Sequence, residues 1–164
     1  MTVMELGAIG EFVGAIAVVV TLIYLAFQMR QNTNALKLNT AASVTEELQE
    51  MFSLLASNQE LAEIFVTAAR ESTLQGAERV RFYTFIHNLV RVYENAFLQW
   101  RAGVIDPAHW EGMARMMIDV TSMAAFQTYW QDRKHWVSED FQEYMESEVV
   151  SAPPKTGVPV PGDY

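Results

Sequence analysis

The sequence predicts an all-α protein in which one N-terminal transmembrane helix continues into a small helical bundle. Residues 12–29 form an apolar run that only Thr21 and Gln28 interrupt. After residue 38, apolar residues recur at spacings of three and four, which is the period of an amphipathic helix. No segment alternates polar and apolar residues over a useful length, so no strand is expected.

The apolar run is long enough for one membrane span. At about 1.5 Å per residue, residues 12–29 cover roughly 27 Å, and residues 6–10 extend the helix past the roughly 30 Å of a hydrocarbon core. The main alternative is a cleaved signal peptide, because residues 15–17 resemble a cleavage site. However, residues 1–10 carry no Lys or Arg, and the longest apolar run follows that site. We therefore expect an uncleaved anchor.

The charges that flank the run predict its orientation. Arg30 and Lys37 follow the run, whereas Glu5 and Glu11 precede its apolar part. Basic residues favour the cytoplasmic side of a span. The N-terminus is therefore expected outside the membrane, and the C-terminal domain in the cytoplasm.

Three parts are expected along the chain. Residues 1–38 form the anchor and a stalk helix, since residues 30–38 contain no Gly or Pro. Residues 39–150 form one helical domain, because the rest of a 164-residue chain is too short for two cores. Residues 151–164 are rich in proline and glycine, and an extended tail is expected there.

The first two helices of the domain are recognised by their apolar stripes and by a cap. One helix ends near Ser57, and its stripe consists of Val44, Leu48, Met51, Phe52 and Leu55. Asn58 is the expected N-cap of the next helix, which ends near Ser72, with Gly76 in the break. Its buried face is expected to hold Leu61, Ile64, Phe65 and Ala68.

The longest helix of the domain is predicted over residues 77–102. Gly103 supplies its C-terminal stop. Asp106 and the proline after it are a strong helix start, because Asp caps the first turn and Pro fits the first helical position. Two shorter helices are expected at residues 124–136 and 139–149.

Composition and charge exclude several classes of site. The formal net charge of −9 argues against binding nucleic acid or anionic lipid surfaces, which needs clustered Lys and Arg. The chain has no cysteine, so disulfides, iron–sulfur clusters and thiolate zinc sites are excluded. At helical spacing, the metal-ligand pairs are Asp106 with His109 and Asp132 with His135, and Asp106 is better used as a cap. We expect no metal and no cofactor.

A stripe of small residues along the predicted span is a candidate docking face for another helix. Small residues let membrane helices approach closely, although such a stripe also arises by chance. The stripe consists of Gly7, Gly10, Gly14, Ala17 and Thr21. Glu11 lies beside it. A carboxylate inside a span is costly and usually functional, but Glu11 also fits the outer headgroup layer.

A polar row on the long domain helix is the second candidate site. His87, Arg91 and Glu94 are spaced by four and three, so their side chains can meet. Three interpretations stay open: a solvated face, a buried polar network that specifies packing, and a catalytic or ligand-binding cluster. No catalytic motif or Gly-rich phosphate loop accompanies the row.

The C-terminal half is rich in methionine and aromatic residues. The default interpretation is that these side chains form the core. A second interpretation is a surface that fits a partner, because both residue types are favoured at interfaces. The interface candidates are Trp110, Met113, Met117, Trp130 and Trp136.

Residues 22–33 read Leu-Ile-Tyr-Leu-Ala-Phe-Gln-Met-Arg-Gln-Asn-Thr. This segment resembles the end of the single N-terminal span in a widespread set of uncharacterised bacterial proteins, in which a small helical domain follows. The later matching segments are Asn58-x-Glu60-Leu61, Tyr93-Glu94-Asn95, and Gly103-x-x-Asp106 followed by Trp110. The resemblance implies a bacterial inner-membrane protein with a cytoplasmic helical domain. It implies no activity, cofactor or catalytic residue.

Two classes of function are compatible with these patterns. The first is a non-enzymatic, membrane-anchored accessory or assembly subunit, bound to lipid and to other membrane-protein subunits, identical or foreign, in a respiratory, photosynthetic or transport complex. The second is a self-assembling homo-oligomer that forms a scaffold or a pore lined by Glu11, or a membrane-bound enzyme that uses the polar row. The absence of a recognisable catalytic motif in the sequence favours the first class.

Overall fold

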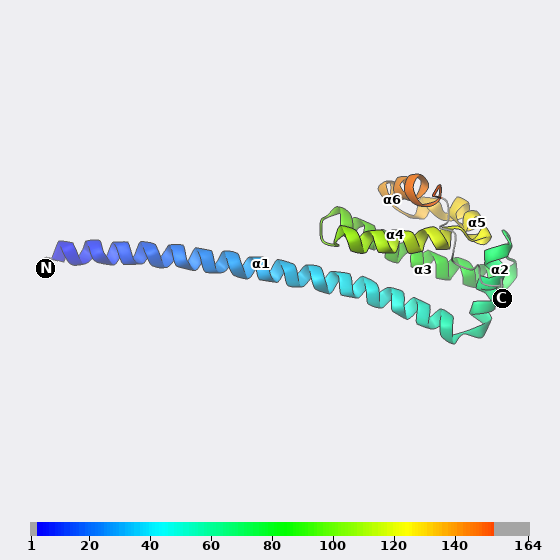
Figure 1. Ribbon diagram of the computed structural model, residues 1–164, viewed down its shortest axis with the longest axis horizontal. Helices are drawn as coiled ribbons and strands as arrows, with labels where there is room; N and C mark the ends of the chain where they lie inside the picture. The colour runs from blue at the N-terminus through cyan, green and yellow to red at the C-terminus, as the bar shows by residue number, and fades with distance from the viewer. Residues whose placement is uncertain (1–2, 153–164) are drawn as a thin grey trace. The chain divides into compact units, whose positions relative to one another are not determined.

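The computed structural model of the protein is all-α, with a long apolar N-terminal helix followed by a small helical bundle (Figure 1). This confirms the predicted fold class. The structure describes residues 3–152, except for the side chains of residues 5, 6, 8 and 9. Nearly all of the tail expected at residues 151–164 therefore lies outside the described residues. The chain separates into two compact units, Met1–Thr40 and Ala41–Tyr164; the boundaries predicted at residues 38 and 150 stay predictions.

Helix α1 runs from Val3 to Ser57. Within the described residues, it is the one helix that is long and apolar enough to cross a membrane, with a window of mean hydropathy 2.2. The two polar residues of the apolar run bond inside the helix. The Thr21 hydroxyl donates to the Ala17 carbonyl at 2.8 Å, and the Gln28 amide donates to the Tyr24 hydroxyl at 2.8 Å. Both polar groups thus find partners without water.

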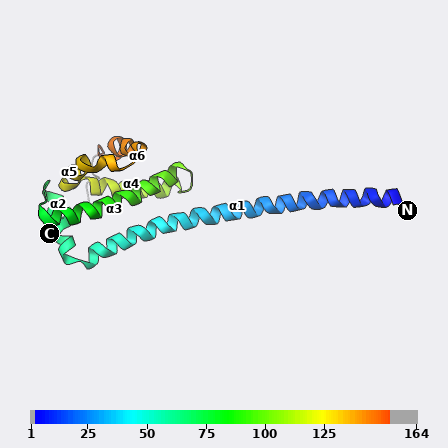
Figure 2. The same cartoon turned by 180° about the vertical axis from the view of Figure 1, so that it is seen from behind.

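The bundle consists of short and medium helices that follow α1. They are α2 (Gln59–Arg70), α3 (Gly76–Arg101), α4 (Pro107–Thr121), α5 (Ala124–Arg133), the 3₁₀ turn η1 (Lys134–Trp136), α6 (Glu139–Tyr144) and the π-helical turn η2 (Met145–Val149). Helix α3 packs against α2 and α4, and α5 packs against the same two helices. In both views α3 and α4 run side by side (Figure 1, Figure 2).

The helix ends follow local chemistry, and the predicted caps are confirmed. The Asn58 side chain accepts a hydrogen bond from the Leu61 amide at 3.0 Å. The Asp106 side chain accepts one from the Ala108 amide at 2.9 Å, with proline in the first turn of α4. Gly103 follows α3 with φ of +69°, a left-handed conformation that glycine adopts without strain.

Some boundaries differ from the prediction. Gly76, expected in the break, is the first residue of α3. The helix predicted at residues 124–136 tightens into the 3₁₀ turn η1, and the helix predicted at residues 139–149 widens into the π-helical turn η2. Both changes occur in the C-terminal turn of a helix. The carbonyl groups there have no regular α-helical partner, so 3₁₀ and π hydrogen-bond patterns are common.

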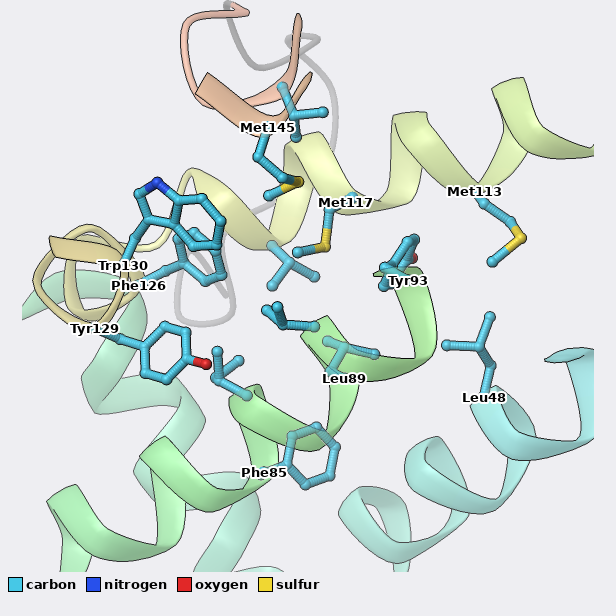
Figure 3. Close-up of a cluster of buried hydrophobic side chains, with 14 of the residues drawn as sticks. Leu48, Phe85, Leu89, Tyr93, Met113, Met117, Phe126, Tyr129, Trp130 and Met145 are labelled. Atoms are coloured by element: carbon cyan, nitrogen blue, oxygen red, sulfur yellow. The ribbon is translucent and has the colours of Figure 1, made fainter. Parts of the chain in front are cut away.

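The core of the bundle forms around α3. Figure 3 shows Tyr93 of α3 between Met113 and Met117 of α4, whereas Phe85 points away from α4 and its ring meets Phe65 of α2. The end of α1 contributes Val44 and Leu48, which are also buried. Facing helices thus bury one continuous apolar cluster, as the stripes predict.

Truncation of a core side chain tests this account. Leu89→Ala is expected to lower the free energy of unfolding by about 2–5 kcal/mol, because it leaves a cavity among packed side chains. Leu98→Ala is the matched control on the same helix, since Leu98 is 49% exposed; its change should stay within about 0.5 kcal/mol. Urea unfolding followed by tryptophan fluorescence measures both. Equal losses would contradict the assignment of the core face of α3.

Candidate functional site

The small-residue stripe of α1 is uncovered in this chain. A Cβ atom added at Gly7, Gly10 or Gly14 would meet no atom within 4 Å. Ala17 and Thr21 are exposed on the same helix, and the Thr21 hydroxyl is turned onto the backbone. Residues three and four apart share a helix face, so these small side chains leave a shallow strip. A second helix can approach such a strip closely.

Glu11 is exposed between Gly10 and Phe12. Phe12 is 68% exposed, and large exposed apolar side chains continue through the rest of the run. The carboxylate therefore lies at the start of the apolar surface. This position is compatible with both interpretations of Glu11, the functional carboxylate and the headgroup residue.

The polar row of α3 separates into two parts, and the first is Arg91 with Glu94. Glu94 is only 4% exposed. One of its carboxylate oxygens forms an ion pair with Arg91, and the other accepts a hydrogen bond from the Ser138 amide at 2.7 Å. Ser138 precedes α6, so this buried carboxylate connects α3 to the start of α6. This is the geometry of a polar group that fixes packing.

His87 forms the second part of the row and joins α5. Its Nδ1 lies 3.2 Å from the Tyr129 hydroxyl, and its ring meets the Trp136 ring edge-on with centroids 5.0 Å apart. Burial lowers the pKa of His87, and the nearby Arg91 and Arg133 guanidiniums lower it further, while Glu94 opposes them. The imidazole is therefore held in its neutral form around neutral pH.

A cleft lies between α3 and the α5–η1 segment. It has a volume of about 310 Å³, with Val80 and Thr84 in its wall. The residues that give it chemistry are Arg79, Tyr83, His87, Tyr129, Arg133 and Trp136. Asp132 holds the two sides together, because its carboxylate accepts hydrogen bonds from Arg79 at 2.8 Å and from the Tyr83 hydroxyl at 2.9 Å.

Sequence reasoning identified His87 and Trp136 but missed the arginines and tyrosines of this cleft. Arg79, Tyr83 and His87 are spaced by four, which was a signal that they share a helix face. No local pattern connects them to Arg133, which lies at the cleft because side chains of α5 contact side chains of α3. The contact with Asp132 spans 53 residues of sequence from Arg79.

The five interface candidates separate by burial. Four of them, Trp110, Met113, Met117 and Trp130, are buried within the chain and form part of its core. Trp136 is 49% exposed at the rim of the cleft. Of this set, Trp136 alone offers a large surface to another molecule.

No group of three or more His, Asp or Glu side chains within the described residues could hold a metal ion.

A protein-family model matches residues 2–152, and the chain belongs to that family, DUF6082, a family of unknown function. No curated protein and no solved structure matches the chain.

The hydrogen bond between Glu94 and the Ser138 amide predicts that two substitutions of Glu94 differ in their effect on stability. Glu94→Ala is expected to lower the free energy of unfolding by about 1–3 kcal/mol, because the Ser138 amide loses its acceptor and Arg91 loses its ion-pair partner. Glu94→Gln retains a carbonyl oxygen for that amide and should lose less. Thermal unfolding of both variants measures the difference. Equal losses would mean that the bond to Ser138 contributes nothing.

The lowered pKa of His87 predicts a pH dependence of stability. The unfolded chain has the ordinary histidine pKa of about 6.5, so it binds a proton more readily than the folded chain, and stability falls as the pH drops through this region. His87→Phe should flatten the slope between about pH 7.5 and pH 5.5. His109→Phe, on the exposed side of α4, controls for removal of a histidine elsewhere. An unchanged slope in His87→Phe would contradict the assignment.

Proposed function

We propose that this protein is a non-enzymatic accessory or assembly subunit of a larger membrane complex, anchored in the bacterial inner membrane by the apolar part of α1. One observation carries the proposal: none of the most apolar window of α1 is buried within the chain. Membership in a family of unknown function adds no activity to this picture.

The exposed apolar surface needs a non-aqueous environment. Burying one Val, Leu, Ile or Phe side chain contributes about 1.5–3 kcal/mol, so a run of such residues strongly favours transfer out of water. The large side chains that are about half exposed or more include Phe12, Ile16, Val18, Leu22, Ile23, Leu25 and Phe27. The internal hydrogen bonds of Thr21 and Gln28 reduce the cost of placing polar groups in lipid.

The small-residue stripe supports a subunit over a simple anchor. Lipid chains solvate large apolar side chains well, so a helix that serves only as an anchor has no need of an open strip. Here Gly7, Gly10 and Gly14 leave space at their Cα atoms for a neighbouring backbone. The proposed partner is a transmembrane helix of another membrane-protein subunit, identical or foreign.

The charges support a bundle in the cytoplasm. Arg30 and Lys37 follow the apolar run, and basic residues are retained on the cytoplasmic side. The formal net charge of −9 opposes binding of the bundle to an anionic membrane surface or to nucleic acid. A protein partner suits this acidic domain better than either.

Co-purification from mildly solubilised native membranes tests the proposal. The double substitution Gly10→Ile with Gly14→Ile should abolish recovery of the partner, because the added side chains hold the two backbones apart. The double substitution Ala15→Ile with Ala26→Ile is the matched control, since it places the same two side chains on another face of α1. Native mass spectrometry identifies what leaves the membrane with each variant.

Different outcomes of this experiment test the stripe, the identity of the partner and the membrane anchor separately. Recovery of partners with both double variants would remove the stripe from the interface. A product that contains only copies of this chain would favour a self-assembling scaffold or pore, and Glu11→Gln would then be the next substitution to test. Release of the protein from membranes by alkaline washing would refute the anchor itself.

A further inference from the structure

The cleft between α3 and η1 contains two arginines in different electrostatic situations. Arg79 is neutralised, because its guanidinium pairs with Asp132 at 2.8 Å. Arg133 has no carboxylate partner within the part of the chain that the structure describes. Its guanidinium lies 4.5 Å from the centre of the Trp136 ring. In a chain with 20 acidic and 11 basic residues, an unpaired arginine in a cleft is a local excess of positive charge.

His87 adds a neutral hydrogen-bond donor to the same cleft. Burial raises the pKa of Tyr129, so its hydroxyl keeps its proton and can donate it to Nδ1 of His87. When Tyr129 donates to Nδ1, the single N–H group of the neutral imidazole is on Nε2. The cleft therefore combines the cationic guanidinium of Arg133 with the neutral N–H group of His87.

Aromatic rings form the walls of the cleft. Tyr83 and Tyr129 meet edge-to-face with centroids 5.2 Å apart, and Trp136 stands at the rim with half of its surface exposed. Flat apolar molecules stack on such surfaces. A volume of about 310 Å³ lies at the lower end of ligand-binding pockets, so the cleft suits a molecule of one or two rings.

We propose that this cleft binds a small, flat aromatic carboxylate, with the carboxylate on Arg133 and His87 and the ring system against Trp136. A planar guanidinium and a carboxylate match in geometry and charge. One unpaired guanidinium and one neutral donor suit a monoanion, whereas a phosphate dianion calls for more positive charge. The cleft lies wholly within the unit Ala41–Tyr164, so this inference does not depend on the membrane anchor or on its partner.

Binding of naphthalene-2-carboxylate to the full chain tests the proposal. The protein is held in nanodiscs of zwitterionic lipid, and binding is followed by saturation-transfer NMR, with empty nanodiscs subtracted. The neutral amide of the same ring system is the matched ligand. We expect the amide to bind at least about tenfold more weakly, since it cannot form the charge-assisted bond to Arg133.

Two arginine substitutions locate the site. Arg133→Gln should weaken binding of the carboxylate by about tenfold or more. Arg101→Gln is the matched control, because Arg101 also lies over an aromatic ring, that of Phe97, but outside the cleft. Its affinity should be unchanged. Trp136→Ala provides a second variant at an exposed residue, and it should weaken binding of both the carboxylate and the amide.

Several results would overturn the proposal. They are a failure of the carboxylate to bind, equal affinities for carboxylate and amide, and equal losses in Arg133→Gln and Arg101→Gln. Thermal unfolding of each variant verifies that it is folded at the temperature of the binding measurement. These results leave the membrane proposal untouched, because that proposal is tested on α1 by co-purification.

Discussion

Burial of one face of α3 is the interaction on which the bundle depends. Leu89 and Tyr93 of this helix meet side chains from α4 and α5, and the end of α1 adds Leu48 to the same cluster. Such burial supplies most of the favourable free energy of a small domain. Because a helix is rigid, fixing its apolar face also fixes the direction of its polar residues. The row of His87, Arg91 and Glu94 and the wall of the cleft follow from that orientation.

Polar contacts in the bundle then decide how the shorter helices attach. Glu94 binds the Ser138 amide before α6, and Asp132 of α5 accepts hydrogen bonds from Arg79 and Tyr83. A buried or half-buried carboxylate needs such partners, so each one selects a single arrangement of neighbouring helices. Arg133 is the exception in this region, since it carries charge without a carboxylate partner among the described residues. That contrast is the basis of the proposed ligand site, whereas Glu94 connects α3 to the start of α6.

The two compact units differ in the exposure of their large apolar side chains. The bundle buries most of its large apolar side chains within the chain. The apolar run of α1 leaves them exposed, and it satisfies its polar groups, Thr21 and Gln28, through bonds inside the helix. Only an apolar environment removes that surface from water, which is the basis of the proposed anchor and of its proposed contact with another helix.

The sequence by itself determined the all-α class, the long apolar helix, and the caps at Asn58 and Asp106. These features depend on residues within a few positions of one another, so composition and periodicity report them. Tertiary structure alone decided that Glu94 turns inward to Ser138, that His87 joins Tyr129, and that four of the five interface candidates enter the core. It also assembled the cleft from residues more than 40 positions apart. Periodicity identifies which residues share a helix face, but which helix covers that face depends on the packing of the whole bundle.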